Sequence, residues 1–526
     1  MGVSRRDMLT GAIAMGATAM TSNAASARRP KNDGIERWGV FELELTGPAR
    51  GNPIDDVTLA ATFTCGGDSL TVPGFYDGDG VYRVRFSPPR IGVWQWRSRS
   101  NVEALDARTG SFRSILPGPD NHGPVSVTPD GYHFAYADGT PFRQIGTTSY
   151  SWALQSDALC DETLATLARA PFNKIRMCLL PPVAQVAPVA ANPFVKTGPG
   201  PRDWDPTRPD PAFFRRFEQW IERLCTLGIE ADVILYTPYN QARGFADMRR
   251  ADDERYLHYV AARFGAYRNV WWSMANEYDG VKSKTMADWD HLFVTLQAAD
   301  PHDRLRSIHQ RNIYYDYRKP WITHASIQNG SAVLNDARAQ PHRNFAQKAV
   351  IFDEVMYEGD SSKRWGQLTG EEMVERFWWG LIAGTYVGHS ETYQRHSWLG
   401  EGGRMIGTSV ARLAFLRRIL ETAPLPGIEP IETWYEFHLG GKPFNYYLRY
   451  FGDARPTEWP LILPGRAEDP KNSFRADIID TWNMTITPVD GVFTMAQRDH
   501  YTHHDPTRPT MALPGKPWIA VRLTRV

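Results

Sequence analysis

The pattern of apolar and polar positions divides the chain into three parts. In residues 36–118, short runs such as "FELELTG" and "VYRVRFS" alternate apolar and polar residues, and Gly, Pro, Asn and Asp separate the runs. Alternation with a period of two places successive side chains on opposite faces of a β-strand. Several short strands in succession are typical of a β-sandwich. We therefore predict an N-terminal, immunoglobulin-like β-sandwich over residues 34–120.

From residue 140 the pattern changes to strand, loop and helix. Apolar runs such as "KIRMCLL" and "EADVILY" alternate with helical segments such as "PAFFRRFEQWIERLCTLG", in which Asp210 is the expected N-cap and Gly228 the expected stop. The alternation gives eight strand positions, the number in a (β/α)₈ barrel. We predict an α/β chain with a (β/α)₈ TIM barrel over residues 128–423. The helical pattern is weakest between the fifth and sixth strands.

After residue 424 the β pattern returns, in runs such as "PFNYYLRYFG" and "FRADIIDTWNMTITPV". These runs predict a C-terminal β-sandwich over residues 424–526. The Pro- and Gly-rich stretch "LPGPDNHGPVSV" separates the first two parts.

The N-terminus has the order of an export signal. Arg5 and Arg6 precede an apolar run that is too short to span a bilayer, and Ala25 and Ala27 have the small-x-small spacing of a cleavage site. The segment resembles the bacterial twin-arginine signal, which exports folded proteins. We expect residues 1–27 to be removed and the mature protein to be periplasmic or secreted, with no membrane contact after removal.

Charge and motifs exclude several classes of function. The 59 basic and 59 acidic residues cancel, and no long run of one sign occurs, so we expect no nucleic-acid partner. The four cysteines show no CxxC spacing, which predicts neither a zinc site nor a disulfide framework. The chain also lacks G-x-S-x-G, H-E-x-x-H and P-loop motifs. We expect no metal and no cofactor; the oligomeric state is not indicated.

Two predicted strands end on glutamates. In "NVWWSMANEYDG" a buried strand leads to Glu277, and in "VIFDEV" the seventh strand leads to Glu354. An unpaired carboxylate is costly to bury, whereas catalytic groups of a barrel lie at the carboxyl ends of its strands. Two such carboxylates can cleave a glycosidic bond, one as a proton donor and the other as an anion. Strict alternation predicts that only one of Asp353 and Glu354 points into the barrel. Glu358 is a reserve nucleophile or a ligand of a sugar hydroxyl.

These residues resemble the motifs of clan A glycoside hydrolases, which carry Asn-Glu after strand four and a nucleophilic Glu after strand seven. The order of the predicted domains is similar to that of apiosidase-related glycosidases. The resemblance implies a retaining hydrolase in which Glu277 is the acid/base and Glu354 the nucleophile. It also implies that Asn276 binds the sugar 2-hydroxyl and that Arg176, in "NKIR", keeps Glu354 ionised.

Other polar and aromatic residues at strand ends or in the following loops are candidates for sugar binding. Aromatic faces stack on the C–H face of a pyranose, and polar groups bind its hydroxyls. The candidates are Tyr239, His309, Gln310, Gln328, Trp152 and Trp365, with Trp398 as a further aromatic residue.

The pattern leaves alternatives open. We expect an oligosaccharide or a polysaccharide side chain as the substrate, but the sugar, its linkage and exo or endo action cannot be read from the residues. A transglycosylase would use the same two carboxylates. A non-catalytic carbohydrate-binding protein on a degenerate barrel is the main alternative, and a structural protein built on the two sandwiches is another.

Overall fold

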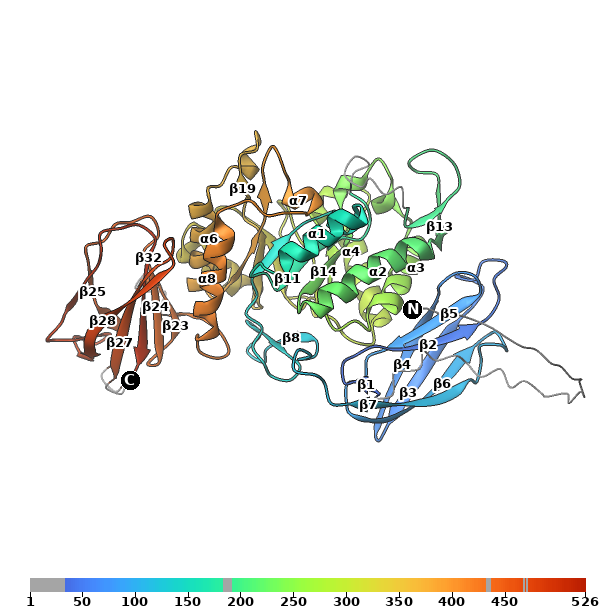
Figure 1. Ribbon diagram of the computed structural model, residues 1–526, viewed down its shortest axis with the longest axis horizontal. Helices are drawn as coiled ribbons and strands as arrows, with labels where there is room; N and C mark the ends of the chain where they lie inside the picture. The colour runs from blue at the N-terminus through green and yellow to red at the C-terminus, as the bar shows by residue number, and fades with distance from the viewer. Residues whose placement is uncertain (1–33, 183–191, 432–436, 467–468, 470–471) are drawn as a thin grey trace, which may run out of the picture.

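The structure, a computed structural model, describes residues 34–182, 192–431, 437–466, 469 and 472–526. The predicted signal peptide, residues 1–27, lies outside the described residues. The chain forms three parts that follow one another along the long axis: a β-rich N-terminal part, a central barrel and a β-rich C-terminal part (Figure 1).

The N-terminal part is a seven-stranded sheet with the order β1-β7-β6-β3-β4-β5-β2. Its strands are β1 (Ile35–Glu36), β2 (Phe41–Thr46), β3 (Leu59–Cys65), β4 (Asp68–Tyr76), β5 (Val81–Phe86), β6 (Gly92–Ser100) and β7 (Thr109–Ile115). The first part of β4 pairs with β3 and its last three residues pair with β5, so two groups of strands share β4. Phe63 and Phe86 stack 4.2 Å apart in the core between these groups.

A hairpin of β8 (Val125–Val127) and β9 (Phe134–Tyr136) follows the N-terminal sheet. Phe134 packs with Trp271, Leu305 and Ile351, which lie at the amino ends of barrel strands or just before them. The hairpin therefore closes the amino end of the barrel with apolar side chains. The carboxyl ends of the strands, where catalytic groups of barrels lie, are at the opposite end.

Eight parallel strands form the predicted TIM barrel, which is confirmed. The strands are β10 (Gly146–Thr148), β11 (Lys174–Cys178), β14 (Glu230–Tyr236), β15 (Val270–Ala275), β16 (Arg306–Ser307), β17 (Ala325–Gln328), β18 (Val350–Glu354) and β20 (Tyr386–His389). They pair in order, and a parallel bridge between His309 and Ser326 closes the ring between β16 and β17. Almost every strand residue is buried because the barrel is filled inside and covered by helices outside.

Helices surround the barrel on the outside. They are α1 (Asp157–Leu167), α2 (Pro211–Thr226), α3 (Arg250–Phe264), α4 (Met286–Ala299), α5 (Asp336–Ala346), α6 (Gly370–Ile382), α7 (Trp398–Glu401) and α8 (Ser409–Glu421). The predicted N-cap of α2 is confirmed, because the Asp210 carboxylate accepts the N–H of Ala212. Between β16 and β17, residues 308–324 contain no helix, in agreement with the weak helical pattern there.

Short strand pairs lie outside the barrel ring. β12 (Phe194–Lys196) pairs with β13 (Trp204–Pro209) after the second barrel strand. β19 (Glu358–Gly359) pairs in parallel with β21 (Glu391–Thr392) and joins the loops that follow barrel strands seven and eight.

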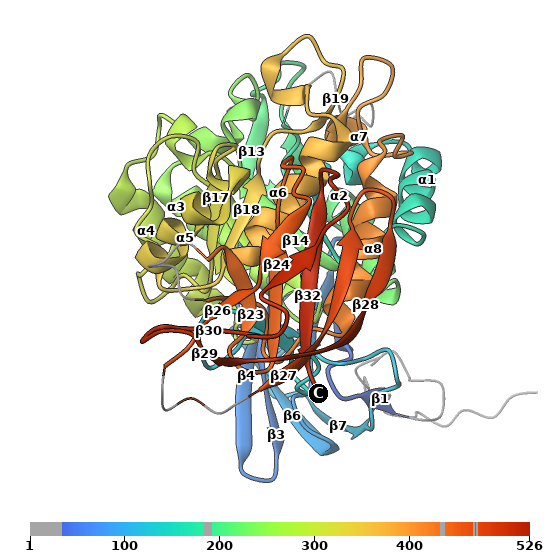
Figure 2. The same cartoon turned by 90° about the vertical axis from the view of Figure 1, so that its left-hand side faces the viewer.

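The C-terminal part contains a six-stranded sheet with the order β22-β23-β24-β32-β27-β28, which faces the viewer in Figure 2. Its strands and the smaller ones beside it are β22 (Glu429–Ile431), β23 (Leu439–Lys442), β24 (Tyr446–Tyr450), β25 (Glu458–Pro460), β26 (Ile462–Pro464), β27 (Ser473–Asp480), β28 (Thr485–Thr494), β29 (Ala496–Gln497), β30 (Thr502–His504), β31 (Thr510–Ala512) and β32 (Ile519–Arg525). The sheet packs on α6, where Tyr450 stacks on Trp378 with the ring centres 5.4 Å apart.

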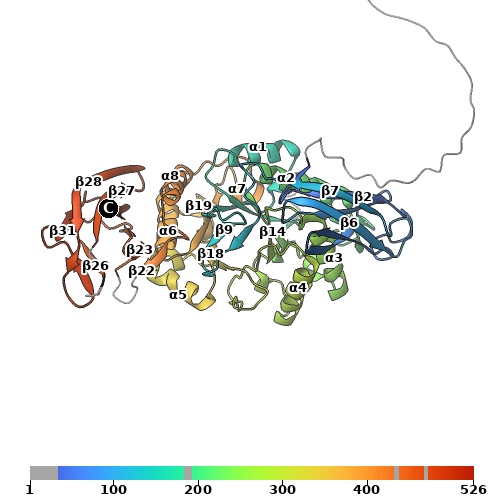
Figure 3. The same ribbon diagram turned by 90° about the horizontal axis from the view of Figure 1, so that it is seen from below.

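The barrel lies between the two β-rich parts when the molecule is viewed from below (Figure 3). A buried ion network joins β5 to α2 and α3. Arg85 donates to Glu218, and Arg263 donates to Glu218 at 2.8 Å and to Asp77 at 2.8 Å. The N-terminal sheet is thus attached to the barrel by paired charges rather than by a flexible linker.

Two further observations concern the helices and the cysteines. Among the described residues, no helix combines the length and apolar character that a membrane-spanning segment requires. All four cysteines are free thiols.

Candidate active site

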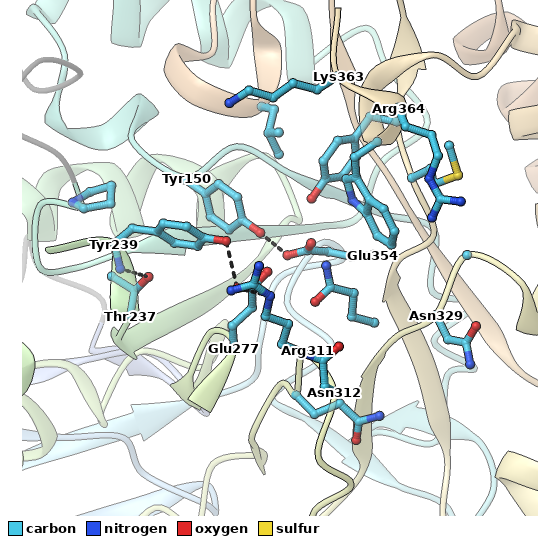
Figure 4. A pocket seen from close by; sticks show the side chains of 18 of the residues that line it. Tyr150, Thr237, Tyr239, Glu277, Arg311, Asn312, Asn329, Glu354, Lys363 and Arg364 are labelled. Carbon is cyan, nitrogen blue, oxygen red and sulfur yellow. Dashed lines mark hydrogen bonds and ion pairs between the residues drawn. The ribbon is translucent and has the colours of Figure 1, made fainter. Parts of the chain in front are cut away.

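A cavity of about 1210 Å³ opens at the carboxyl ends of the barrel strands. Its wall includes Tyr150, which follows β10, Glu277, which follows β15, and Glu354, which ends β18. Figure 4 shows both glutamates in the same cavity, each with a tyrosine hydroxyl at its carboxylate. The structure therefore brings together the two carboxylates that the sequence singled out.

Glu277 occupies an unusual backbone position at the end of β15. Its φ and ψ angles are 47° and 53°, in the left-handed region that disfavours residues with a Cβ. The Tyr239 hydroxyl donates to its carboxylate at 2.7 Å, and Arg311 Nε lies 3.8 Å from the same oxygen. The surrounding fold therefore offsets both the strain of the Glu277 backbone and the burial of its carboxylate. Strained residues that are held in this way are common at functional sites.

Glu354 lies in a more enclosed environment. Its Oε1 accepts a hydrogen bond from Tyr150 and lies 3.7 Å from Arg176 Nη1. Burial raises the pKa of Glu354 above its ordinary value, and the nearby Glu277 carboxylate acts in the same direction. The Arg176 charge and hydrogen bonds from Tyr150 and Tyr357 lower this pKa and so favour the carboxylate anion.

Asp353 and Glu354 both face the barrel interior, so the prediction that only one of them does is wrong. The register between β17 and β18 shifts by one residue: Ser326 pairs with Ile351, but Gln328 pairs with Glu354. Such a bulge places an extra residue in one strand and interrupts the alternation of side chains. Asp353 and Glu354 both approach Arg176, at 3.8 Å and 3.7 Å.

A buried ion group lies beneath the glutamates. Lys174 Nζ donates to Asp232 at 2.8 Å and to Asp353 at 2.9 Å, and Ser326 also donates to Asp353 at 2.5 Å. Burial would raise the pKa of Asp353, but Lys174 and Arg176 hold it well below its ordinary value. Arg176 Nε lies 3.7 Å from Asp232 and 3.8 Å from Asp353, so the same two carboxylates balance the Arg176 charge.

Asn276 and His309 lie beside the two glutamates: Asn276 contacts Arg176, and His309 contacts both Glu277 and Glu354. Arg176 Nη2 donates to the Asn276 side-chain oxygen at 3.2 Å. His309 Nδ1 accepts the backbone N–H of Glu277 at 3.4 Å, and its Nε2 lies 3.9 Å from Glu354. Burial lowers the pKa of His309 well below its ordinary value, so the ring is neutral. With Nδ1 as an acceptor, the ring proton lies on Nε2 and faces Glu354.

Several predicted sugar-binding residues line the cavity. Tyr239, Gln310, Gln328 and Trp365 are among the lining residues. Gln310 Oε1 accepts a hydrogen bond from Tyr317 at 3.0 Å, whereas Gln328 Oε1 has no protein partner among the described residues. Gln328 thus has an amide oxygen free to bind an added hydroxyl group.

Five predicted substrate-binding residues are not in the cavity wall. Asn276, Arg176 and His309 are buried beside the glutamates, whereas Trp152 and Glu358 lie elsewhere, so the predictions for these two are wrong. Trp152 is fully buried and packs on Trp220, with ring centres 6.1 Å apart. Glu358 accepts the backbone N–H groups of Thr408 and Ser409 at the start of α8 and is not part of the cavity wall. Trp398 is also fully buried. Position in a loop predicted exposure, but the loops fold back onto the barrel.

The sequence did not single out several residues of the cavity wall: Tyr150, Tyr357, Arg311, Lys363, Arg364 and Arg376. Tyr150 had a detectable signal, because it follows the first predicted barrel strand, in "GTTSY". The others lie in loops or on α6, where position in the sequence does not indicate which way a side chain points.

Comparisons with known proteins agree with this geometry. Residues 128–398 match the family described as "Apiosidase-like, catalytic domain", and residues 34–101 and 434–524 match two domains of unknown function, DUF5060 and DUF5605. A proposed glycoside hydrolase from Bacteroides vulgatus is 38% identical, with a TM-score of 0.89, and the match covers 94% of this chain and 99% of that one. No curated protein matches the sequence.

A more distant structure shares the fold alone. A family 5 glycoside hydrolase from Bacteroides vulgatus is 14% identical, with a TM-score of 0.55, over 77% of this chain and 94% of that one. The barrel and its paired glutamates, together with the family match and the 38% identical relative, define a glycoside hydrolase. The chain belongs to the apiosidase-like family.

Proposed function

We propose that this chain is a retaining glycoside hydrolase that uses Glu277 as the acid/base and Glu354 as the nucleophile. Glu354 attacks the anomeric carbon while Glu277 protonates the departing glycosidic oxygen, so that a glycosyl-enzyme ester forms. Glu277 then takes a proton from water, the water attacks the same carbon, and the ester bond to Glu354 breaks.

One observation carries this proposal: two buried glutamates from barrel strands four and seven line one cavity, each with a tyrosine donor. Their surroundings favour different roles. Arg176, Tyr150 and Tyr357 oppose the effect of burial on the Glu354 pKa and favour the anion, the form that a nucleophile requires. Glu277 contacts Tyr239 and Arg311, whose side chains are exposed to water, so water that replaces the leaving group has a polar, solvated environment beside this carboxylate.

Product configuration and azide rescue test the roles. Wild-type protein acting on an aryl glycoside with a good leaving group should release sugar of unchanged anomeric configuration, as followed by NMR. With azide, Glu277→Ala should give a glycosyl azide of retained configuration, because the ester to Glu354 still forms. Glu354→Ala should give the azide of inverted configuration, because azide then occupies the position of the missing carboxylate.

Different outcomes would contradict parts of the proposal. Inverted sugar from the wild type would exclude double displacement. Exchanged azide configurations would reverse the two roles. Glu277→Gln and Glu354→Gln variants that fold normally and turn over at the wild-type rate would exclude both catalytic roles. Wild-type protein that binds these sugars without cleaving any of them would favour the carbohydrate-binding alternative.

The charge of the cavity wall bears on the substrate, which we propose to be an oligosaccharide or polysaccharide side chain carrying acidic sugars. The cavity wall contains four basic residues: Arg311, Lys363 and Arg364, which are exposed, and Arg376, which is buried. The acidic residues of the wall are Glu277 and Glu354. Cations lining a cleft attract anionic ligands and raise their local concentration. Arg311 lies beside Glu277, but Lys363 and Arg364 form no ion pair with any described residue. These two cations support a substrate with carboxylates away from the bond that breaks.

This substrate class has a direct test. Lys363→Ala/Arg364→Ala should raise KM for a uronate-bearing oligosaccharide about tenfold, and salt should reduce the wild-type rate on it. The rate on a matched neutral oligosaccharide should stay unchanged. Arg318→Ala, an exposed arginine that already pairs with Asp316, is the control for loss of a surface charge. An equal loss on both substrates would contradict the acidic preference.

We also propose export through the twin-arginine route, from the sequence of residues 1–27. Replacing Arg5 and Arg6 by lysine should retain the protein in the cytoplasm in a bacterial host with that route. Unchanged export would contradict the proposal.

A further inference from the structure

A second cluster of acidic and imidazole groups lies behind barrel strands seven and eight. Glu358 in β19, His389 at the end of β20 and Glu391 in β21 are 1%, 0% and 0% exposed. Potential ligand atoms of the three side chains all lie within 4.8 Å of one another. None of the three belongs to the wall of the catalytic cavity.

Backbone N–H groups hold the two carboxylates in place. Residues 406 and 407 donate to Glu391 at 2.6 Å each, and residues 408 and 409 donate to Glu358 at 2.6 and 3.2 Å. A Cβ at Gly407 would collide with Oε2 of both glutamates, so these two oxygens converge on one point. The turn before α8 therefore fixes two carboxylates toward each other.

The pair lacks a cationic partner. Among the described residues, no arginine or lysine lies within ion-pair distance of Glu358 or Glu391, whereas Asp353 has Lys174 at 2.9 Å and Asp253 has Lys284. The start of α8 offsets part of the charge. Burial, and then the neighbouring Glu358, raise the pKa of Glu391 to about 7. Two buried carboxylates need a counter-charge that the described side chains do not supply.

His389 directs an unused nitrogen into this region. Its Nδ1 lies 3.1 Å from the Thr147 hydroxyl, and its Nε2 has no hydrogen-bond partner among the described residues. Burial lowers the pKa of His389 to about 4, so the ring is neutral and one nitrogen carries a free lone pair. A ligating histidine commonly donates its other N–H to a neighbouring oxygen, as Nδ1 can do to Thr147.

We propose that Glu358, His389 and Glu391 form a structural site for a divalent cation, with Zn²⁺ as the favoured ion. An imidazole nitrogen and two carboxylate oxygens are ligands that Zn²⁺ accepts, and a double positive charge balances the two carboxylates. A backbone or water oxygen would complete the coordination.

The site would brace the loops around the catalytic cavity. Glu358 and Glu391 belong to β19 and β21, which join the loops after barrel strands seven and eight. Glu391 accepts N–H groups from the turn before α8, and Glu358 accepts those of residues 408 and 409 where the helix begins. The loop between β18 and α6 also carries Lys363 and Trp365 of the cavity wall. The cation would thus order one side of the cavity without touching substrate. This inference does not depend on the proposed reaction.

Metal content and metal titration of the full mature chain test the site. Protein purified without chelator should contain about one equivalent of zinc by mass spectrometry. After removal of metal, added Zn²⁺ should raise the midpoint of thermal unfolding, because a ligand that binds only the folded state stabilises it. Added Co²⁺ should give the visible absorption of a protein-bound ion, which reports on binding independently of unfolding.

Two variants and a matched control locate the ion. Glu391→Gln and His389→Gln should each weaken Co²⁺ binding about tenfold or more, with an unchanged circular dichroism spectrum. The control is His133→Gln in the other acidic and imidazole cluster, Asp130, His133 and Glu429. There both imidazole nitrogens already have partners, Tyr386 and Glu429, so Co²⁺ binding should be unchanged.

Three results would overturn the inference. The first is the absence of bound metal together with no effect of Zn²⁺ or Co²⁺ on the wild type. The second is metal binding that survives in both variants. The third is stabilisation by a proton alone. A raised pKa of Glu391 gives stability that is present at low pH and is lost as the pH rises through about 7. If that pH dependence is found without any metal effect, a shared proton rather than a cation balances the carboxylates.

Discussion

Glu277 shows at the scale of one residue how function and stability oppose each other. Its left-handed backbone, with φ of 47°, costs a residue with a Cβ about 1–2 kcal/mol, whereas glycine adopts it freely. Glu277→Gly should therefore be more stable than Glu277→Ala by about 1 kcal/mol in urea unfolding. Ala275→Gly, within β15, should have the opposite effect and lower stability. Equal stabilities of the two Glu277 variants would contradict this account.

Tyr150 should set the pH at which the nucleophile ionises. Its hydroxyl donates to Glu354 and favours the anion, so its loss raises the pKa of Glu354 further above the ordinary value. In Tyr150→Phe, the acidic limb of the kcat/KM profile should move to higher pH. Tyr82→Phe, in the N-terminal sheet, is the control, since the Tyr82 hydroxyl donates to Pro48 instead. A profile that falls in height without moving would contradict the prediction.

At the scale of the elements, the ion network between β5, α2 and α3 should hold the N-terminal sheet on the barrel. Glu218→Ala leaves Arg85 and Arg263 buried without their main partner and should cost about 3–5 kcal/mol of unfolding free energy. Arg223→Ala, on the same helix but in an exposed pair with Asp161, should cost less than about 1 kcal/mol. Similar losses in the two variants would mean that this network contributes no more than a surface pair.

The same network gives a pH dependence of stability. Burial would raise the pKa of Asp77, but Arg263 and Arg83 lower it overall. A carboxyl whose pKa is depressed on folding stabilises the fold above its unfolded pKa, and this contribution is lost as the pH falls through the folded value. The wild type should therefore lose stability below about pH 4, and Asp77→Asn should lose less over that range. Parallel acid curves would contradict the role of Asp77.

The elements also show what the sequence could predict. Strands such as β14 and β15 are long apolar runs between helices, so period and length sufficed to place Glu277 and Glu354 at one end of a barrel. The bulge in β18 could not be predicted, because it depends on pairing with β17 and not on local pattern. The burial of Trp152 against Trp220 likewise depends on a contact between distant segments.

At the scale of the whole molecule, the barrel and the C-terminal part share one core. Trp378 on α6 is fully buried and stacks on Tyr450 of β24. Removing residues 424–526 would expose this apolar face of α6 to water, which favours aggregation. The truncated chain should be less soluble and unfold at a lower temperature than the full chain.

A point variant separates this packing from other effects of truncation. Tyr450→Ala in the full chain should cost about 3–5 kcal/mol of unfolding free energy, as expected for loss of a buried aromatic ring. Tyr501→Ala, at an exposed ring in the C-terminal part, should cost much less. A truncated barrel as stable as the full chain would show that the two parts fold independently.

The bulge in β18 has a consequence for the electrostatics of turnover. By bringing Asp353 and Glu354 to Arg176 together, it gives the barrel interior three carboxylates, Asp232, Asp353 and Glu354, against the two cations Lys174 and Arg176. This interior carries one excess negative charge when the positive, oxocarbenium-like transition state forms above it. Formation of the glycosyl ester at Glu354 removes that charge and leaves the interior neutral. The negative charge of the barrel interior would thus stabilise the positive transition state, and the interior would have no net charge once the glycosyl ester has formed.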